Sequence, residues 1–569
     1  MSFGQRPVRA RRRAAAESAE AELPGIDPLL AALYRSRGID DAGELDYRLG
    51  RLLPVGTLPG IDAAVDLLLA HRQGRVLVIG DFDADGATST ALVLRCLRAF
   101  GFPDAAYLVP NRFDFGYGLT PQLVAVAAAD APTLIVTVDN GVSSVDGVRA
   151  AREAGIDVLV TDHHLPPTEL PAAEVIVNPN LAGSRFGSPN LAGVGVAFYL
   201  MAALGRRLEG EGLAQAAKVP ARFLDLVALG TVADVVRLDH NNRILVSQGL
   251  ERIRAGRTLA GIAALLEVAG RSPARCVSSD LGFAVAPRLN AAGRLTDMSV
   301  GIECLLADDE STARRLAVEL DEINLARRDI ETTMREQAFA AVDSIDTRRL
   351  DACVSLYDER WHAGVVGLVA ARIRERCHRP CIAFAVERDG ELKGSARSIP
   401  GVHMRDLLEA ISSRQPGLVR KFGGHAMAAG LSIATDDFDA FRRAAAQAMR
   451  ERHPDADLSG AIITDGPLPG PALTLDFAET LRHAGPWGAG FPEPVFHGDF
   501  RVREQRVVGD RHLRLRVEAE DAPRPVDAIA FHQEPLPARG PVRLAYRLDV
   551  NEYRGSRTPQ LIVEQISPL

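Results

Sequence analysis

The chain has 569 residues, several times the roughly 100–200 of a typical domain, so we expect three or four domains. Its 47% hydrophobic content is that of a globular protein with an ample core, and no stretch approaches the roughly 18 consecutive apolar residues of a membrane span. The 74 acidic and 66 basic residues give a net charge of −8, which excludes a polycation that binds nucleic acid with its whole surface.

The first 50 residues are predicted to form a tail and a helical lead-in. Arginines stand at positions 9, 11, 12 and 13, but no apolar segment follows them, so this is not a secretory signal. The six cysteines are too few for a disulfide framework and lack the C-x-x-C spacing of a metal site. A cytoplasmic protein without a membrane partner is therefore expected.

Residues 51–305 are predicted to form one α/β domain. Between residues 75 and 180, a short β-branched run, a polar turn and an Ala/Leu-rich helical stretch follow one another repeatedly. Four runs are apolar enough to be strands buried on both faces, at residues 76–79, 134–138, 158–160 and 175–177. The alternation predicts a parallel sheet covered by helices, and residues 190–305 are predicted to be mainly helical.

Three further segments follow this domain. Residues 306–346 are charged, rich in helix formers and free of proline and glycine, which predicts a connecting helix. Residues 350–455 are predicted to form a second α/β domain. From Val495 to Ile566, strand-like alternation dominates with glycine and proline between the runs, which predicts that residues 465–569 form a small β-barrel or sandwich.

Acidic and histidine residues stand where three of the predicted strands end. The carboxyl ends of parallel strands lie along one edge of a sheet, where ligands bind. A fourth acid, Asp234, lies in the helical region and could fold back over this edge. The residues at the strand ends are Asp81, Asp83 and Asp85 after the first strand, Asp139 after the second, and Asp162, His163 and His164 after the third.

This set of side chains indicates a metal site. Carboxylates at close range raise one another's pKa unless a cation shares the site. Carboxylates with one or two imidazoles suit Mg²⁺ or Mn²⁺, and histidine favours Mn²⁺. Five or six ligands exceed what one ion needs, so two ions are expected, and the usual chemistry of such a site is phosphate-ester hydrolysis. A single Asp-Gly pair most often marks a turn or a helix N-cap, but four acidic motifs in this order are not explained in that way.

The segments GDFDADG, VDNG, TDHH and GTVADVV resemble the four ordered motifs of the DHH phosphoesterase superfamily. Within it, the chain is similar to the RecJ family of exonucleases specific for single-stranded DNA, over about residues 20–569. Supporting segments are NLAGVGVAF (190–198), PRLNAAGR (287–294), WHAGVVGLVA (361–370) and KFGGHAMAAG (421–430). The resemblance implies a multidomain α/β fold with a DHH-type parallel α/β catalytic domain, a long connecting helix, a DHH-associated α/β domain and a C-terminal barrel of the oligonucleotide-binding (OB) type.

The resemblance also implies roles for the residues at the sheet edge, which together form the predicted catalytic set. Asp162 is expected to hold a ligating histidine in one tautomer, and His164 to orient the cluster or to approach the scissile phosphate. Asp81 is expected to be a further ligand or a neighbour of the ligands. The expected metal ligands are Asp83, Asp85, Asp139, His163 and Asp234.

A second group of residues is predicted to bind the substrate. The Gly-Gly-His signature of the DHH-associated domain appears as Gly423, Gly424 and His425, where glycines let backbone N–H groups approach phosphate; simple turns are the alternative. His425 also joins the catalytic set, because it could position a phosphate. A terminal 5′-phosphate matches a guanidinium fork, whereas surface or ion-paired arginine is the alternative. The candidates for this contact are Arg112, Arg288, Arg294, and Arg397 with Ser395.

The barrel is expected to hold single strands by stacking and by a basic groove. Phe500, Tyr546 and Tyr553 are the predicted stacking residues, and a simple solvated strand face is the alternative for the arginines. One departure from the family is Phe491, which stands where the family usually has Asn. The arginines predicted to line the groove are Arg501, Arg503, Arg506, Arg511, Arg514 and Arg516.

The resemblance implies a metal-dependent 5′→3′ exonuclease that hydrolyses single-stranded DNA to 5′-mononucleotides in recombination and repair, beside a helicase and a single-strand-binding protein. One alternative is a DHH phosphodiesterase of short oligonucleotides or cyclic dinucleotides, although those enzymes resemble only the two catalytic domains. Another is a noncatalytic single-strand-binding scaffold, although such proteins lose metal ligands and every expected ligand is present here.

Overall fold

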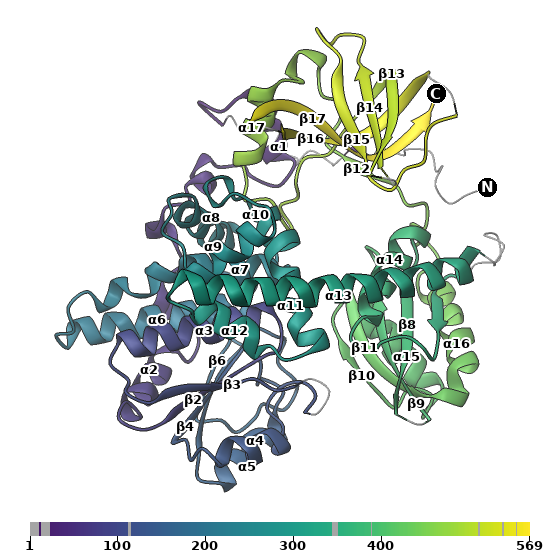
Figure 1. Cartoon of the computed structure of the whole chain (residues 1–569). Coiled ribbons are helices and arrows are strands. Elements are labelled where there is room, and N and C mark those ends of the chain that lie inside the picture. The colour runs from purple at the N-terminus through teal and green to yellow at the C-terminus, as the bar shows by residue number, and fades with distance from the viewer. Residues whose placement is uncertain are drawn as a thin grey trace. The chain divides into compact units, whose positions relative to one another are not determined.

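The structure is a computed structural model that describes residues 11–12, 23–111, 115–343, 351–388, 390–509, 512–537, 540–553 and 555–569 (Figure 1). These residues form two compact units. The smaller unit contains the described residues of 325–462, and the larger one those of 12–324 and 463–569. The boundary falls within the long helix α13 (Glu310–Asp343), so this helix belongs in part to each unit.

A parallel sheet of five strands lies in the larger unit. Four of the strands follow the predicted runs of valine, leucine and isoleucine, whereas the strand Ala105–Leu108 was not predicted. Its strands are β2 (Val76–Gly80), β3 (Ala105–Leu108), β4 (Leu134–Val138), β5 (Asp157–Thr161) and β6 (Val175–Val177). The strand order is β3-β2-β4-β5-β6, so the order reverses between β2 and β4. The crevice beyond the carboxyl ends of the strands at such a reversal is where open α/β sheets bind ligands.

Helices cover both faces of this sheet (Figure 1). The helices α4 (Pro121–Ala128) and α5 (Val145–Glu153) pack on the face to which Leu77 and Ile79 of β2 contribute. The helices α2 (Ile61–Ala70), α3 (Ala84–Ala99) and α6 (Gly193–Gly210) pack on the other face, with Val76 and Val78. Successive side chains of β2 therefore enter two different apolar cores, as its continuous apolar run predicts.

The remainder of residues 190–305 is helical, as predicted. The helices here are α7 (Leu224–Ala233), α8 (His240–Arg254), α9 (Ala260–Val268), α10 (Ser278–Asp280), α11 (Ala286–Leu295) and α12 (Ser299–Leu306), and α1 (Pro28–Arg35) precedes the sheet.

No single helix among the described residues is both long and apolar enough to cross a membrane. One bent pair, residues 49–57 with α2, passes that test by length and composition only.

The smaller unit contains a mixed sheet with three helices. Its strands are β7 (Val354–Tyr357), β8 (Cys381–Arg388), β9 (Glu391–Arg397), β10 (Lys421–Gly424) and β11 (Ala428–Ala434). The helices are α14 (Val366–Cys377), α15 (Met404–Arg414) and α16 (Phe438–Arg452). The strand order is β10-β11-β9-β8-β7, and only β7 and β8 pair in parallel. The α/β class is as predicted, whereas the three antiparallel pairings of the sheet were not predicted.

The C-terminal segment forms a closed barrel, so of the two predicted forms the barrel is found. The barrel order is β13-β14-β15-β17-β16, preceded by α17 (Leu475–His483), while the short β1 (Arg11–Arg12) and β12 (Ile463–Thr464) pair separately. The barrel strands are β13 (Phe496–Val508), β14 (His512–Glu518), β15 (Val526–Ala530), β16 (Pro541–Tyr553) and β17 (Ser556–Pro568).

The predicted stacking role is wrong for two of the three aromatic residues of the barrel. Phe500 and Tyr546 are 4% and 1% exposed and pack edge to face inside the barrel, with ring centroids 5.5 Å apart. Both side chains fall on the inward side of the alternation, where a closed barrel buries them. The side chain of Tyr553 and residue Arg511 lie outside the described part of the chain.

A buried ion pair joins the barrel segment to the helical part of the larger unit. The guanidinium of Arg37 binds the carboxylate of Asp465 at 3.0 Å, and both side chains are almost completely buried.

Phe491, the departure from the family pattern, is also buried in this part of the larger unit. Its ring stacks on Trp487 at 5.1 Å, and the guanidinium of Arg243 lies 4.7 Å from its centroid. An apolar stacking role thus accounts for an aromatic residue at position 491.

Candidate metal centre

The first acidic motif follows β2 and enters α3. Asp83 is the N-cap of α3, and its carboxylate accepts hydrogen bonds from the backbone N–H groups of Asp85 (2.9 Å) and Gly86 (3.0 Å). The side-chain oxygen of Asn290 on α11 accepts a hydrogen bond from the N–H of Ala84 (2.8 Å). These bonds satisfy the free N–H groups at the helix start and fix the turn that carries the acids.

Asp85 is buried in the first turn of α3, and the start of α6 holds its carboxylate. The backbone N–H groups of Gly193 and Val194 donate to it at 2.6 and 2.9 Å. Burial and the neighbouring charge of Asp83 raise the pKa of Asp85 to about 7, against the effect of these two hydrogen bonds. The carboxylate is therefore fixed in place and destabilised in its charged form at the same time.

Asp139 follows β4 in a left-handed backbone conformation, with φ of 62°, which Asp adopts more readily than most residues. Its side chain is buried, and α6 begins directly against it. A Cβ at Gly193 would lie 2.6 Å from the Cβ of Asp139, so only glycine fits there. The close approach of α6 closes the metal site on this side.

The tandem histidines follow β5, and Asp162 organises them. Its carboxylate accepts hydrogen bonds from the backbone N–H of His163 (2.7 Å) and from Nδ1 of His164 (2.7 Å). Its second oxygen accepts from the N–H of Val142 (2.9 Å). Burial opposes ionisation of Asp162, but the hydrogen bond and charge of His164 hold its pKa below the ordinary value. The histidine that Asp162 holds in one tautomer is thus His164. The contact with Asp162 raises the pKa of His164, although burial acts in the opposite direction.

Asp234 comes from the helical region, at the C-cap of α7. Its Oδ2 lies 3.5 Å from Nε2 of His163, and the same nitrogen lies 3.1 Å from Oδ1 of Asp139. A Cβ at Gly230 would lie 2.7 Å from Val194 and 2.8 Å from Asp85, so glycine there lets α7 pack closely against the site. The helix therefore folds back over the sheet edge, as the sequence suggested it could.

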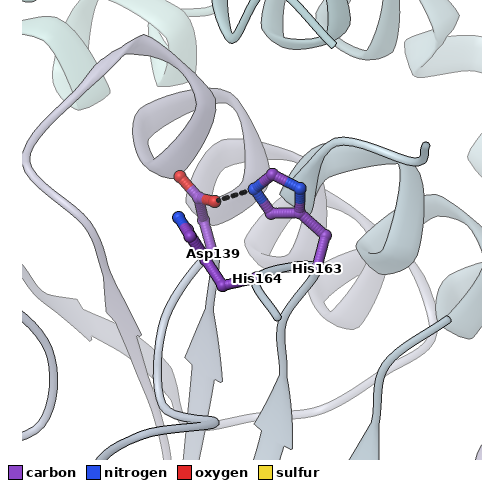
Figure 2. A group of neighbouring side chains, drawn as sticks. All are labelled: Asp139, His163 and His164. Atoms are coloured by element: carbon purple, nitrogen blue, oxygen red, sulfur yellow. Dashed lines mark ion pairs between the residues drawn. The ribbon is translucent and has the colours of Figure 1, made fainter. Parts of the chain in front are cut away.

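The six predicted ligands, together with His164, form three groups that could hold a metal ion. In each group one ligand atom per residue lies within 4.8 Å of the others. The first group shares His163 with the second and Asp139 with the third. Figure 2 shows the first group, with the ring of His163 directed at the carboxylate of Asp139. The groups are Asp139 with His163 and His164, Asp85 with His163 and Asp234, and Asp81 with Asp83 and Asp139.

The chemistry of this cluster fits divalent cations. Burial and the charges of the surrounding carboxylates raise the pKa of Asp139 and of Asp234 well above the ordinary value. Among the described residues, no donor satisfies the buried Oδ1 of Asp139 or the buried Oδ2 of Asp234 with a hydrogen bond. Oxygen ligands with limited imidazole suit Mn²⁺ or Mg²⁺, and the overlapping groups leave room for more than one ion.

Two residues that contact this cluster were not predicted from the sequence. Tyr117 places its hydroxyl 3.2 Å from Nδ1 of His164, and burial with the charges of Asp162 and Asp81 raises its pKa well above the ordinary value. Asn290, within the segment PRLNAAGR, caps α3. PRLNAAGR supported the family resemblance, but only its arginines were singled out.

The smaller unit brings five of the predicted substrate residues together. Across the sheet, Gly423 of β10 pairs with Gly430 of β11, which pairs with Ser395 of β9. Arg397 donates a hydrogen bond to the hydroxyl of Ser395 (3.0 Å), and burial lowers the pKa of Arg397. Gly424 has φ of 138°, which a residue with a side chain rarely adopts, and the exposed His425 follows it.

The three remaining substrate candidates differ in their surroundings. Arg288 is buried and forms an ion pair with Asp321 at 2.7 Å, besides a hydrogen bond to the carbonyl oxygen of Ala284 (2.6 Å). Its guanidinium thus already has anionic and carbonyl partners within the protein. Arg294 is half-buried in the last turn of α11. Arg112 lies outside the described residues.

Comparison with known proteins gives three family matches. The DHH family N-terminal domain matches residues 75–231, the DHHA1 domain matches residues 350–451, and the RecJ OB domain matches residues 464–565. Over 97% of this chain and 98% of the relative, the sequence is 53% identical to the single-stranded-DNA-specific exonuclease RecJ of Dickeya dadantii.

Solved structures match the fold as well. The structure of RecJ from Thermus thermophilus in complex with Mn²⁺ has a TM-score of 0.79 and 32% identity over 96% of this chain and 76% of that one. The Mg²⁺ complex from the same organism has a TM-score of 0.72 and 30% identity over 96% of this chain and 75% of that one. The predicted fold class is confirmed.

The sheet edge, its acids and histidines and the three matched domains define a multidomain hydrolase of the DHH superfamily that uses divalent metal. Its sequence is close to full-length relatives of one particular kind. The chain belongs to the RecJ family of exonucleases.

Proposed function

We propose that this chain is a metal-dependent exonuclease that degrades single-stranded DNA from the 5′ end to 5′-mononucleotides. One observation supports this above all: eight acidic or histidine side chains of the four motifs, from Asp81 to Asp234, gather at one sheet edge, and all but Asp162 fall in the three groups that could hold a metal ion. The similarity to RecJ supports the nucleic-acid substrate, and the 5′→3′ polarity rests on the family resemblance.

The residues of the site divide into ligands and supports. Asp83, Asp85, Asp139, His163 and Asp234, with Asp81, would hold two Mn²⁺ or Mg²⁺ ions, which when bound supply positive charge to the phosphate and activate water. Asp162 keeps a proton on Nδ1 of His164 and so fixes the direction of that ring. The start of α6 orients Asp85, and the capped start of α3 orients Asp83. These supports hold the ligand oxygens in place before any substrate arrives.

Substrate contacts are proposed in each unit by itself. In the smaller unit, Ser395, Arg397, Gly423, Gly424 and His425 would bind phosphates through a guanidinium fork and close backbone approach, and His425 would position a phosphate. Arg294 remains a candidate for the terminal phosphate, and Arg112 remains a prediction from the sequence. Arg288 also remains a candidate, with Asp321 and the carbonyl oxygen of Ala284 as its present partners.

The outer face of the barrel supports strand binding. Arg501, Arg506 and Arg516 are exposed, and no ion pair is found for them among the residues that the structure describes. Of the other predicted groove arginines, Arg514 binds Asp527 at 2.7 Å and Arg503 forms an ion pair with Glu518, so the charge available to a strand comes from the first three. Phe531, 54% exposed beside His512, takes the stacking role that Phe500 and Tyr546 cannot fill.

The cellular setting follows from the same proposal. We place the enzyme in the cytoplasm, where its six buried cysteines stay reduced, in recombination and repair beside a helicase and a single-strand-binding protein. The proposed functional divisions are residues 51–305 for catalysis, 306–346 for connection, 350–455 for the DHH-associated domain and 465–569 for strand binding.

The experiment that tests this function uses single-stranded DNA labelled separately at its 5′ and 3′ ends. Purified protein is incubated with each strand and with a matched blunt duplex, in Mn²⁺, Mg²⁺ or chelator. We expect mononucleotides to appear at once from the 5′ label, only with metal and not from the duplex. Early release from the 3′ label instead would overturn the proposed polarity.

Two other outcomes favour the alternatives. Intact strand binding without cleavage under either metal would indicate a noncatalytic scaffold. Faster cleavage of dinucleotides or cyclic dinucleotides than of long strands would indicate a small-substrate phosphodiesterase. The barrel argues against the second, because an enzyme of short substrates has no use for an extended basic face.

A further inference from the structure

Tyr117 lies at the border between the metal centre and solvent. Its hydroxyl donates a hydrogen bond to the carbonyl oxygen of Asp139 (3.4 Å) and lies 3.2 Å from the ring of His164. The residue as a whole is nevertheless 50% exposed. The polar end of the side chain therefore sits among the catalytic residues, while part of the ring faces outward.

Two neighbouring rings fix the orientation of Tyr117. Phe82, which stands between Asp81 and Asp83, packs edge to face against it with centroids 6.4 Å apart and planes at 79°. The ring of His164 packs in the same way at 5.8 Å and 74°. An aromatic ring that is held by two neighbouring rings and half exposed to solvent is prepared for stacking with little further ordering.

We propose that the exposed ring of Tyr117 stacks on the base of the nucleotide being removed, while its hydroxyl positions His164. This inference rests on the proposed function, because it needs a nucleotide beside the acid cluster. Every base has a π-face, so such a contact recognises a nucleotide without reading its sequence, as a general exonuclease requires. Tyr117 would thus link the presence of a base to the placement of a catalytic side chain.

The test compares strands whose degraded end carries either a normal nucleotide or an abasic one. For the wild-type enzyme we expect kcat/KM for the first cleavage to fall about 10-fold on the abasic end, which corresponds to about 1.4 kcal/mol. An abasic position several nucleotides inside the strand should leave the first cleavage unchanged. A wild-type enzyme that cleaves both ends equally well overturns the proposal.

Variants at position 117 separate the two roles. Tyr117→Ala should cleave the normal end about 10-fold more slowly and lose the discrimination against the abasic end. Tyr117→Leu serves the same purpose if the alanine variant fails to fold. Tyr117→Phe should keep the discrimination and the KM but lower kcat, because it retains the ring and loses the hydroxyl at His164. Discrimination that survives in the alanine or leucine variant contradicts the inference.

The matched control is Tyr107→Phe. Tyr107 lies on a strand of the same sheet, and its hydroxyl donates a 2.7 Å hydrogen bond to Glu303, outside the acid cluster. The variant therefore loses a comparable contact. It should behave as the wild type on both strands. Failure of the proposed function differs from failure of this inference. In the first case the wild-type enzyme would cleave neither strand with any metal, and in the second it would cleave both equally well.

Discussion

Replacement of His163 by alanine is expected to reduce DNA cleavage by about 1,000-fold or more, while binding of single-stranded DNA stays measurable. His163 faces both Asp139 (3.1 Å) and Asp234 (3.5 Å) and belongs to two of the three ligand groups, so its loss disturbs more than one metal position. The loss of several kcal/mol of charge stabilisation corresponds to this fall in rate. Asp83→Ala should likewise lose cleavage and keep strand binding. Cleavage kinetics and fluorescence anisotropy with a labelled strand measure the two effects.

The chain offers a matched control at the other end of the same sheet. His71 also binds an aspartate, with Nε2 2.9 Å from Asp157, but Asp157 is the first residue of β5, whereas His163 follows its last. His71→Ala should keep near wild-type cleavage. If His163→Ala loses binding and cleavage together, with loss of its circular-dichroism signal, then His163 supports the fold and the assignment as a ligand is wrong.

The metal-free protein is expected to lose stability as the pH rises from about 4 to about 7. Burial and neighbouring acids raise the pKa of Asp85 from 3.8 to about 7 and those of Asp139 and Asp234 well above the ordinary value. In this window the folded state binds more protons than the unfolded state, so stability falls as pH rises. Because these acids interact with one another, the loss of stability belongs to the cluster as a whole rather than to one residue. Thermal unfolding of chelated protein across this range measures it.

Bound Mn²⁺ should cancel this loss, because a cation stabilises the charged carboxylates. Asp139→Asn should raise the melting temperature of the metal-free protein at neutral pH. Asn has nearly the same shape and tolerates the φ of 62° at this position, so the substitution removes charge with little strain. Asp146→Asn, on the exposed surface of α5, should leave the profile unchanged. A metal-free melting temperature that is constant from pH 4 to 7 would argue against mutual repulsion in the cluster.

The part of the site that follows strands could be predicted from the sequence. In a parallel sheet the ends of β2, β4 and β5 must lie along one edge, so motifs after these strands meet whatever the rest of the chain does. Asp234 is different, because its position depends on how α7 packs. That packing needs glycine at 230 against Val194 and Asp85, and no periodicity in the sequence reveals such a contact.

The aromatic residues of the barrel show why two of the predicted stacking residues could not be assigned correctly from the sequence. Strand alternation assigns residues to two faces, but a shift of one residue exchanges the inner face with the outer one. Phe500 and Tyr546 fall on the inner face, whereas Phe531, just beyond β15, is exposed. Burial of Arg288 could not be foreseen either, because its partner Asp321 lies on another helix, far along the chain.

Counting the manganese ions bound to the active enzyme tests the central claim most directly. Two-metal sites hold their ions about 3.5–4 Å apart, close enough for the spins of two Mn²⁺ ions to couple. We expect two Mn²⁺ per chain with a coupled electron paramagnetic resonance signal in the wild-type protein, and loss of that signal in His163→Ala. An active wild-type enzyme that binds a single ion, or ions without coupling, would contradict a two-metal centre at this sheet edge.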